Sequence, residues 1–181
     1  MKITIVSSST RVGRVSHRIA LALVKQIQIS GHETELIDLL ELDLPQFSER
    51  MARLETVPEH WLQTMELLKA SDGIIFLTPE YNGSFTASLK NFIDVFAKDG
   101  FRGKPIGVAT GSSGAQGGIR AAYQLQQVVL SLFAFPSPRM LTVGEMKSKF
   151  DETGALIDES YRRSFEGFAE SFLAFTAKLS V

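Results

Sequence analysis

The chain of 181 residues contains no cysteine. Disulfide bonds, thiolate metal sites and thiol catalysis are therefore all excluded. An excess of charge of one sign is also lacking, since the formal net charge is −1. A domain that binds nucleic acid usually carries a basic face, so this balance argues against nucleic acid as a partner.

Long hydrophobic runs are missing as well. No apolar stretch approaches the roughly 18 residues that a membrane-spanning helix needs, so we expect no contact with a membrane. The first residues, MKITIVSSS, lack the apolar segment and the small-residue cleavage site of a signal peptide. A cytoplasmic location is the resulting expectation.

What remains is an ordinary globular composition, with 44% apolar and 22% charged residues. A chain of this length fits one domain, which can bury about two-thirds of the surface exposed by the unfolded chain. The three histidines, His17, His32 and His60, are scattered along the sequence. They do not predict a metal site, because such sites need convergent ligands.

Short apolar runs alternate with helical patterns along the chain. Strands are expected at 3–6, 33–40, 73–79, 104–111 and 139–143, and helices at about 18–30, 61–70, 86–97, 118–133 and 161–179. A helical turn is expected within the intervening segment SERMARLE. Five βα units predict an α/β fold, a doubly wound five-stranded parallel sheet of order 2-1-3-4-5 with helices on both faces.

In such a sheet, ligands bind outside the carboxyl ends of the strands, near the point where the strand order reverses. The loop after the first strand, SSSTRVGRVSH (7–17), lies at this point. Its side chains that can bind an anion at the start of a helix are Ser9, Thr10, Arg11, Arg14 and Ser16. The loop lacks the Gly-Lys-Ser/Thr ending of an ATP-type P-loop. The alternative is that Ser16 only caps the helix and both arginines are solvated.

Two further loops follow the third and fourth strands. TPEYNGSFTASLKNFID (78–94) contains the turn dipeptide Asn82-Gly83 and a tyrosine, and suits a flat heterocycle with hydrogen-bonding groups. The alternative for this loop is an ordinary turn with a surface tyrosine. GSSGAQGG (111–118) permits close approach of a ligand to the backbone, but glycine-rich turns are common at strand ends.

The first two loops, in this order and spacing, resemble the NADPH-dependent FMN reductase family. The resemblance extends through DLLELDLPQF and GSSGAQGGIRAAYQLQQVV and covers most of the chain. It implies one flavodoxin-like FMN-binding domain over residues 1–181. It also implies an oxidoreductase that passes hydride or electrons from NAD(P)H through bound FMN to a small acceptor, such as a quinone, free flavin, azo compound or metal oxyanion.

The same resemblance assigns roles to individual residues. It places Ser9, Arg11 and Ser16 on the FMN phosphate, with Arg14 as a possible assistant or a surface residue. The residues that it places around the flavin ring are Pro79, Glu80, Tyr81, Asn82, Gly83 and Ser84 on one side and Gly111, Ser112 and Gly114 on the other. No catalytic side chain and no metal are expected, because the flavin N5 carries the hydride.

Two positions depart from the family pattern. Ser8 stands where a glycine is common, and Phe85-Thr86 replaces an apolar residue and a proline. Thr86 can still cap the following helix, so FMN binding is expected to survive. Phe85 puts the preference for substrates in doubt.

The resemblance also implies a homodimer or a dimer of dimers. The aromatic residues Phe85, Phe92, Phe96 and Phe101 exceed what one helix face usually buries, which predicts an interface around that helix. Two other functions stay open. A flavodoxin-type electron carrier would typically be strongly acidic, unlike this chain, and a non-catalytic phosphate-binding module could use the same fold.

Overall fold

The computed structural model describes residues 1–179 and has one parallel sheet. The strands lie in the order β2 (Glu33–Asp38), β1 (Lys2–Ser7), β3 (Gly73–Pro79), β4 (Pro105–Gly111) and β5 (Phe135–Pro136), and β6 (Leu141–Val143) also pairs with β4. This order confirms the predicted flavodoxin-like sheet. β5 pairs with the beginning of β4 and β6 with its end, so two short strands share the fifth position.

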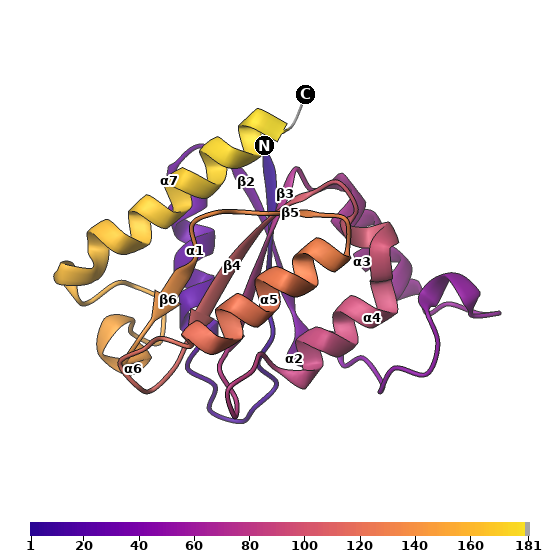
Figure 1. Cartoon of the computed structure of the whole chain (residues 1–181), viewed down its shortest axis with the longest axis horizontal. Helices are drawn as coiled ribbons and strands as arrows, with labels where there is room; N and C mark the ends of the chain where they lie inside the picture. Colours follow the sequence, from indigo (N-terminus) through magenta and orange to yellow (C-terminus); the bar gives the residue numbers. More distant parts are fainter. Residues whose placement is uncertain (180–181) are drawn as a thin grey trace.

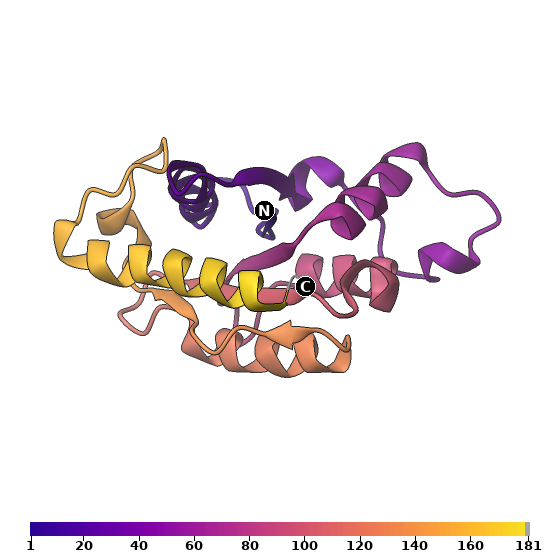
Figure 2. The same cartoon turned by 90° about the horizontal axis from the view of Figure 1, so that it is seen from above.

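Helices cover both faces of the sheet (Figures 1 and 2). α1 (His17–Ile29) and α7 (Arg162–Leu179) pack on one face, and α3 (Glu59–Ala70), α4 (Ala87–Phe101) and α5 (Ile119–Ser131) pack on the other. The shorter helices are α2 (Leu39–Leu42), η1 (Met51–Arg53), α6 (Met146–Lys149) and η2 (Glu159–Tyr161). The segment that contains η1 extends away from the body at the right of both views.

Successive side chains of the central strands point to opposite faces of the sheet, and this alternation divides the core into two layers. In β3, Ile74 and Phe76 pack with α3, α4 and α5, whereas Ile75 and Leu77 pack with α1 and α7. All four side chains are fully buried. A strand with helices on both faces therefore needs apolar residues throughout, as the sequence GIIFLTP predicted.

One prediction about local structure is wrong, and another holds only in part. Leu39 and Leu40 were expected in the second strand but begin α2, because the carboxylate of Asp38 accepts a hydrogen bond from the Leu40 N–H at 3.0 Å and so caps a helix. α4 continues to Phe101, but Ala97, the predicted end, interrupts the helix with φ +48° and ψ −149°, so the first regular part of α4 ends where predicted.

The aromatic residues of α4 also correct an expectation. Phe92, Phe96 and Phe101 have no exposed surface, and the half-buried Phe85 packs against the same cluster. They belong to the core because α4 covers the sheet with one face while its last turn contacts Phe76. They therefore do not support an interface between subunits. Within residues 1–179, no helix is both long and apolar enough to cross a membrane.

Candidate functional site

The loops after β1, β3 and β4 meet at the carboxyl edge of the sheet and enclose a cavity of about 380 Å³. The predicted site residues that line it are Ser9, Arg11, Arg14, Ser16, Pro79, Glu80, Tyr81, Gly111 and Ser112. Asn82, Gly83, Ser84 and Gly114 do not line it. A cavity is thus present where the strand order predicts a site, and most of the expected residues line it.

The loop after β1 presents unpaired donors. Within residues 1–179, no backbone N–H from Ser9 to Gly13 or from Val15 to His17 donates to a backbone carbonyl. Some of these groups belong to the N-terminus of α1, where the helix dipole adds a partial positive charge. Successive free N–H groups of this kind form a binding site for an anion.

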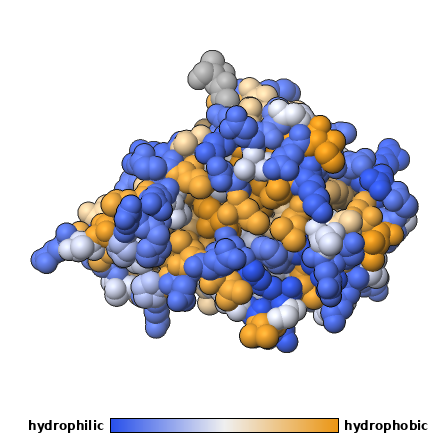
Figure 3. All heavy atoms as spheres, turned by 180° about the vertical axis from the view of Figure 1, so that it is seen from behind, coloured by the Kyte–Doolittle hydropathy of each residue, from blue (hydrophilic) through white to orange (hydrophobic). Residues whose placement is uncertain are grey.

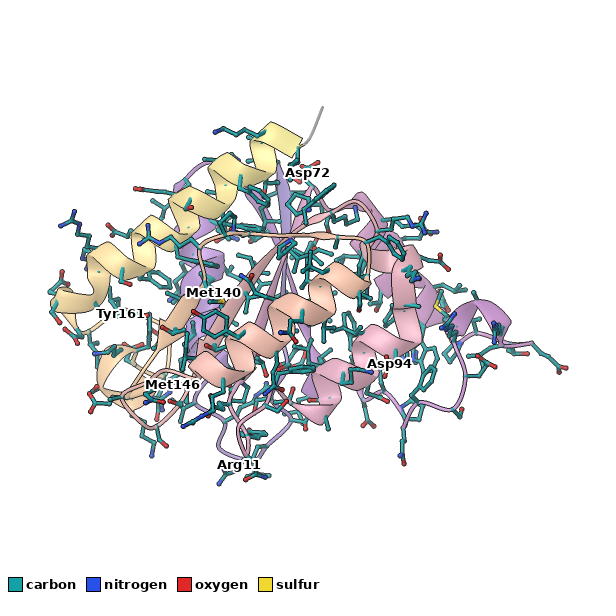
Figure 4. The ribbon with its side chains drawn as sticks, in the orientation of Figure 1. Arg11, Asp72, Asp94, Met140, Met146 and Tyr161 are labelled. Atoms are coloured by element: carbon teal, nitrogen blue, oxygen red, sulfur yellow. The ribbon has the colours of Figure 1, made fainter. Side chains whose placement is uncertain are left out.

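Arg11 and Arg14 have different surroundings. Arg11 is exposed at the lower end of the molecule (Figure 4), and its side chain makes no hydrogen bond or ion pair with the described residues. Arg14 binds both carboxylate oxygens of Asp38 and donates to the Ser9 carbonyl at 2.9 Å. Its side chain is only 14% exposed, and that of Asp38 only 7%. Arg14 therefore holds the loop against β2, and Arg11 is the arginine available to a ligand.

Asp38 and His17 complete this network. Burial alone would raise the pKa of Asp38, but hydrogen bonds from Arg14 and the Leu40 N–H hold it below the ordinary value. Burial, together with the charge of Arg14, lowers the pKa of His17. The Nδ1 atom of His17 lies 3.0 Å from the Ser7 hydroxyl, so this side chain joins the end of β1 to the start of α1.

The two serines of the loop differ in their contacts. The Ser9 hydroxyl lies 2.8 Å from that of Tyr81, which connects the loops after β1 and β3 across the cavity. Ser16 precedes α1 and is 2% exposed, yet its hydroxyl does not cap the helix. The alternative role for Ser16 as a cap therefore does not hold, and Ser16 lines the cavity without capping α1.

The loop after β3 is a two-residue hairpin. Tyr81 and Ser84 exchange backbone hydrogen bonds of 2.8 and 3.0 Å, and the φ angles of Asn82 and Gly83 are +52° and +81°. Both central residues are left-handed, as an Asn-Gly turn of this kind requires. Gln124 in α5 donates to the Gly83 carbonyl at 2.9 Å and lies 2.7 Å from the Ser84 hydroxyl. These contacts hold the turn at Asn82 and Gly83, which do not line the cavity, whereas Tyr81 does.

Glu80 lines the cavity, and its carboxylate contacts the N-terminus of α5. Its carboxylate accepts hydrogen bonds from the backbone of Arg120 and Ala121 and pairs with the Arg120 guanidinium at 3.1 Å. A carboxylate at a helix N-terminus is stabilised by the dipole. Its negative charge is therefore compensated and does not oppose an anion in the cavity.

Ser8 and Thr86, which lie at the two places where the sequence departs from the family pattern, contact each other. Thr86 caps α4 by accepting a hydrogen bond from the Leu89 N–H at 3.2 Å, as predicted. Its hydroxyl lies 2.9 Å from that of Ser8. The Ser8 carbonyl also accepts a hydrogen bond from the Ser88 hydroxyl, so the start of α4 is attached to the loop after β1.

Glycines of the loop after β4 serve packing within the chain. A Cβ at Gly117 would lie 2.7 Å from the backbone of Thr142, and one at Gly111 would lie 2.4 Å from the Met146 sulfur. The segment after β6 therefore packs directly on this loop. Gly114 is open, since the nearest atom to a Cβ there would be 4.0 Å away.

Met146 and Lys147 line the cavity and were not predicted (Figure 4). They follow β6, whose end lies next to that of β4. A signal was available, because every parallel strand ends at the same edge of the sheet. The face opposite to that of Figure 1 has hydrophobic side chains at its centre, bordered by polar ones (Figure 3).

Comparisons with known proteins agree with this geometry. The model of the NADPH-dependent FMN reductase family matches residues 1–147. A quinone reductase of Pseudomonas putida is 31% identical over 94% of this chain and 91% of its own, and an NADPH azoreductase of a Bacillus species is 28% identical over 85% and 83%. The structure of the flavoenzyme FerB, an NAD(P)H:(acceptor) oxidoreductase from Paracoccus denitrificans, superimposes with a TM-score of 0.84 at 24% identity over 98% of this chain and 97% of its own. This chain is an oxidoreductase that belongs to the NADPH-dependent FMN reductase family.

Proposed function

We propose that the cavity binds FMN, with the cofactor phosphate on the loop after β1. The observation that carries this proposal is the run of unpaired backbone N–H groups beside the uncompensated guanidinium of Arg11. The hydroxyls of Ser9 and Ser16 add donors at the same place. A phosphate has enough acceptor oxygens to use all of these groups.

In this proposal, the flavin ring would lie at the other end of the cavity. Pro79 and Tyr81 would border it on one side, and Gly111 and Ser112 on the other. The N–H groups of Glu80 and Tyr81 are already bonded to Gly111 and Ser84. Contacts to the polar edge of the ring would therefore fall to the remaining backbone donors, those of Asn82 and Gly83, after a small movement of the hairpin.

When bound, FMN accepts a hydride from NAD(P)H and passes electrons to a second substrate. The chain needs only to bind and orient the two partners. The names of the relatives support a quinone or an azo compound as the acceptor. A free flavin and a metal oxyanion belong to the same proposal.

Two other functions make different predictions. A flavodoxin-type carrier would bind FMN but would not accept hydride from NADPH alone. A non-catalytic phosphate-binding module would not bind FMN. The chain has a net charge of −1, which disfavours a carrier that docks through a strongly acidic surface.

An absorption spectrum distinguishes the three functions. The protein, reconstituted with FMN and freed of excess cofactor, should be yellow, and anaerobic NADPH should bleach it without a partner enzyme. Colour without bleaching would favour the carrier. Failure to retain FMN would favour the non-catalytic module.

The assembly is a separate part of the proposal. We expect a homodimer or a dimer of dimers on the basis of the family resemblance, although the phenylalanines of α4 do not support it. Light scattering at micromolar concentration should give at least twice the mass of 20.0 kDa of one chain. A monomer would contradict this expectation and would leave the FMN proposal intact.

A further inference from the structure

A second cavity of about 440 Å³ adjoins the first. Four residues line both cavities: Val15, Ser113, Met146 and Lys147. Glu145 and Ser148 complete the second cavity. The two cavities are therefore adjacent, and the four shared residues border both.

The shared wall is well braced. The Met146 N–H donates to the Ser112 carbonyl and the Glu145 N–H to the Gly114 carbonyl, both at 3.3 Å. Just beyond Lys147, Lys149 pairs with Asp158 at 2.7 Å, and Phe150 has no exposed surface. The backbone that carries Lys147 is therefore held on both sides, unlike that of a lysine on a free loop.

The charges at the shared wall favour an anion. The side chain of Lys147 is exposed and makes no ion pair or hydrogen bond with residues 1–179. Arg14 and Glu80 are already neutralised by Asp38 and Arg120. Glu145 is the acidic residue of the second cavity and does not line the first. Lys147 is thus a cation without a partner, placed between the two hollows.

The proposed function indicates which anion would pair with Lys147. A volume of about 380 Å³ is near the lower end of the range for ligand sites, about 300–1,000 Å³, and the FMN phosphate would use Arg11. The hydride donor must reach the flavin with its nicotinamide, while its phosphates extend beyond the first cavity. Val15 and Met146 offer apolar contacts along that path, and Lys147 offers the cation that a phosphate requires.

We propose that a phosphate-bearing part of NAD(P)H lies at the wall shared by the two cavities, which Glu145 does not line, and that Lys147 pairs with that phosphate. This inference rests on the proposed function. It makes Lys147 a determinant of affinity for the nucleotide donor, without a part in binding FMN or the acceptor. The phosphate is either the pyrophosphate, common to both nucleotides, or the 2′-phosphate of NADPH.

The test is calorimetric titration of NADP⁺ and NAD⁺ into FMN-loaded protein, which measures binding without turnover. Lys147→Ala should weaken NADP⁺ binding about 5- to 30-fold, as expected for loss of a partly exposed charge-assisted hydrogen bond. Lys147→Glu should weaken it further. Lys178→Ala is the matched control, because it removes an exposed lysine on a different helix, α7. This variant should bind NADP⁺ like the wild type.

The two nucleotides distinguish the two phosphates. Equal losses for NADP⁺ and NAD⁺ would assign Lys147 to the pyrophosphate, whereas a loss for NADP⁺ alone would assign it to the 2′-phosphate. Unchanged binding of both would overturn the inference. An equal loss of FMN affinity in Lys147→Ala would also overturn it, because Lys147 would then belong to the cofactor. If the wild type fails to bind FMN, the proposed function fails, and titration of the apoprotein with NADP⁺ still tests Lys147.

Discussion

The hydroxyl of Thr86 donates a hydrogen bond to the hydroxyl of Ser8, and the two oxygens are 2.9 Å apart. Both side chains are almost fully buried. This bond joins the loop after β1 to the first turn of α4. The sequence departs from the family pattern at both positions, and the two unusual residues are hydrogen-bond partners of each other.

A double-mutant cycle should detect this coupling. Ser8→Ala and Thr86→Val each leave one buried hydroxyl without its partner, so each should lower the free energy of unfolding by about 1–3 kcal/mol. The double variant should be more stable than the sum of the two losses predicts, by about 0.5–1.5 kcal/mol. Urea unfolding of the four proteins measures this difference. Strictly additive losses would mean that the contact contributes nothing.

The ion pair between Arg14 and Asp38 should stabilise the apoprotein. Asp38→Asn leaves the buried guanidinium uncompensated, and should lower the free energy of unfolding by about 3 kcal/mol at neutral pH. Asp94→Asn breaks an exposed pair with Lys90 and, as the control, should cost less than about 1 kcal/mol.

The pH dependence of the same variant has a definite sign. The pKa of Asp38 is lowered in the folded state from the ordinary value of 3.8. Its contribution to stability is therefore present above that value and is lost as the pH falls through the lower, folded pKa. The stability difference between wild type and Asp38→Asn should shrink over that acidic range. A difference that stays constant would contradict the ion pair.

Ala97 should be a site of backbone strain. Its φ of +48° and ψ of −149° lie in a region that is favourable for glycine and costs other residues about 1–3 kcal/mol. Ala97→Gly should raise the free energy of unfolding by about 1 kcal/mol. The same change at Ala174, an exposed position of α7, should lower it by about 1 kcal/mol. Opposite signs in urea unfolding would confirm the strain, and equal losses would exclude it.

Kinetics should show one flavin face shared by the donor and the acceptor. In the proposed complex, the loops on both sides of the ring would leave room for one flat partner at a time, so NADPH and a quinone should react in turn. Double-reciprocal plots at several quinone concentrations should then be parallel, as in a ping-pong scheme. Intersecting lines would indicate a ternary complex and would contradict a shared site.

Much of the fold could be predicted from the hydrophobic pattern. β3 begins and ends at the predicted residues because it is covered on both faces and bounded by Gly73 and Pro79. The fifth strand could not be predicted as it is, since Phe135–Pro136 is too short to show a period. α6 could not be predicted for the same reason, since its four residues are too few to show a helical period.

The candidate site was predictable where a motif follows a strand directly. The loops after β1 and β3 line the cavity for this reason, whereas Met146 and Lys147 depend on the return of the chain after β6. The pairing of Arg14 was not predictable, because Asp38 lies 24 residues away along the chain. Sequence spacing alone placed both arginines near the anion and could not separate the free one from the paired one.

The central claim is that the loop after β1 binds the FMN phosphate and that Arg11 is its cation. A charge-assisted hydrogen bond contributes about 1.5–3 kcal/mol. Arg11→Ala should therefore weaken FMN binding by about 10- to 150-fold while the stability of the apoprotein changes little. Riboflavin lacks the phosphate, so its affinity should be nearly the same for both proteins. Titration of the two flavins into wild-type and Arg11→Ala apoprotein measures this directly. A selective loss of FMN affinity is the predicted result, and equal losses for FMN and riboflavin would contradict the assignment.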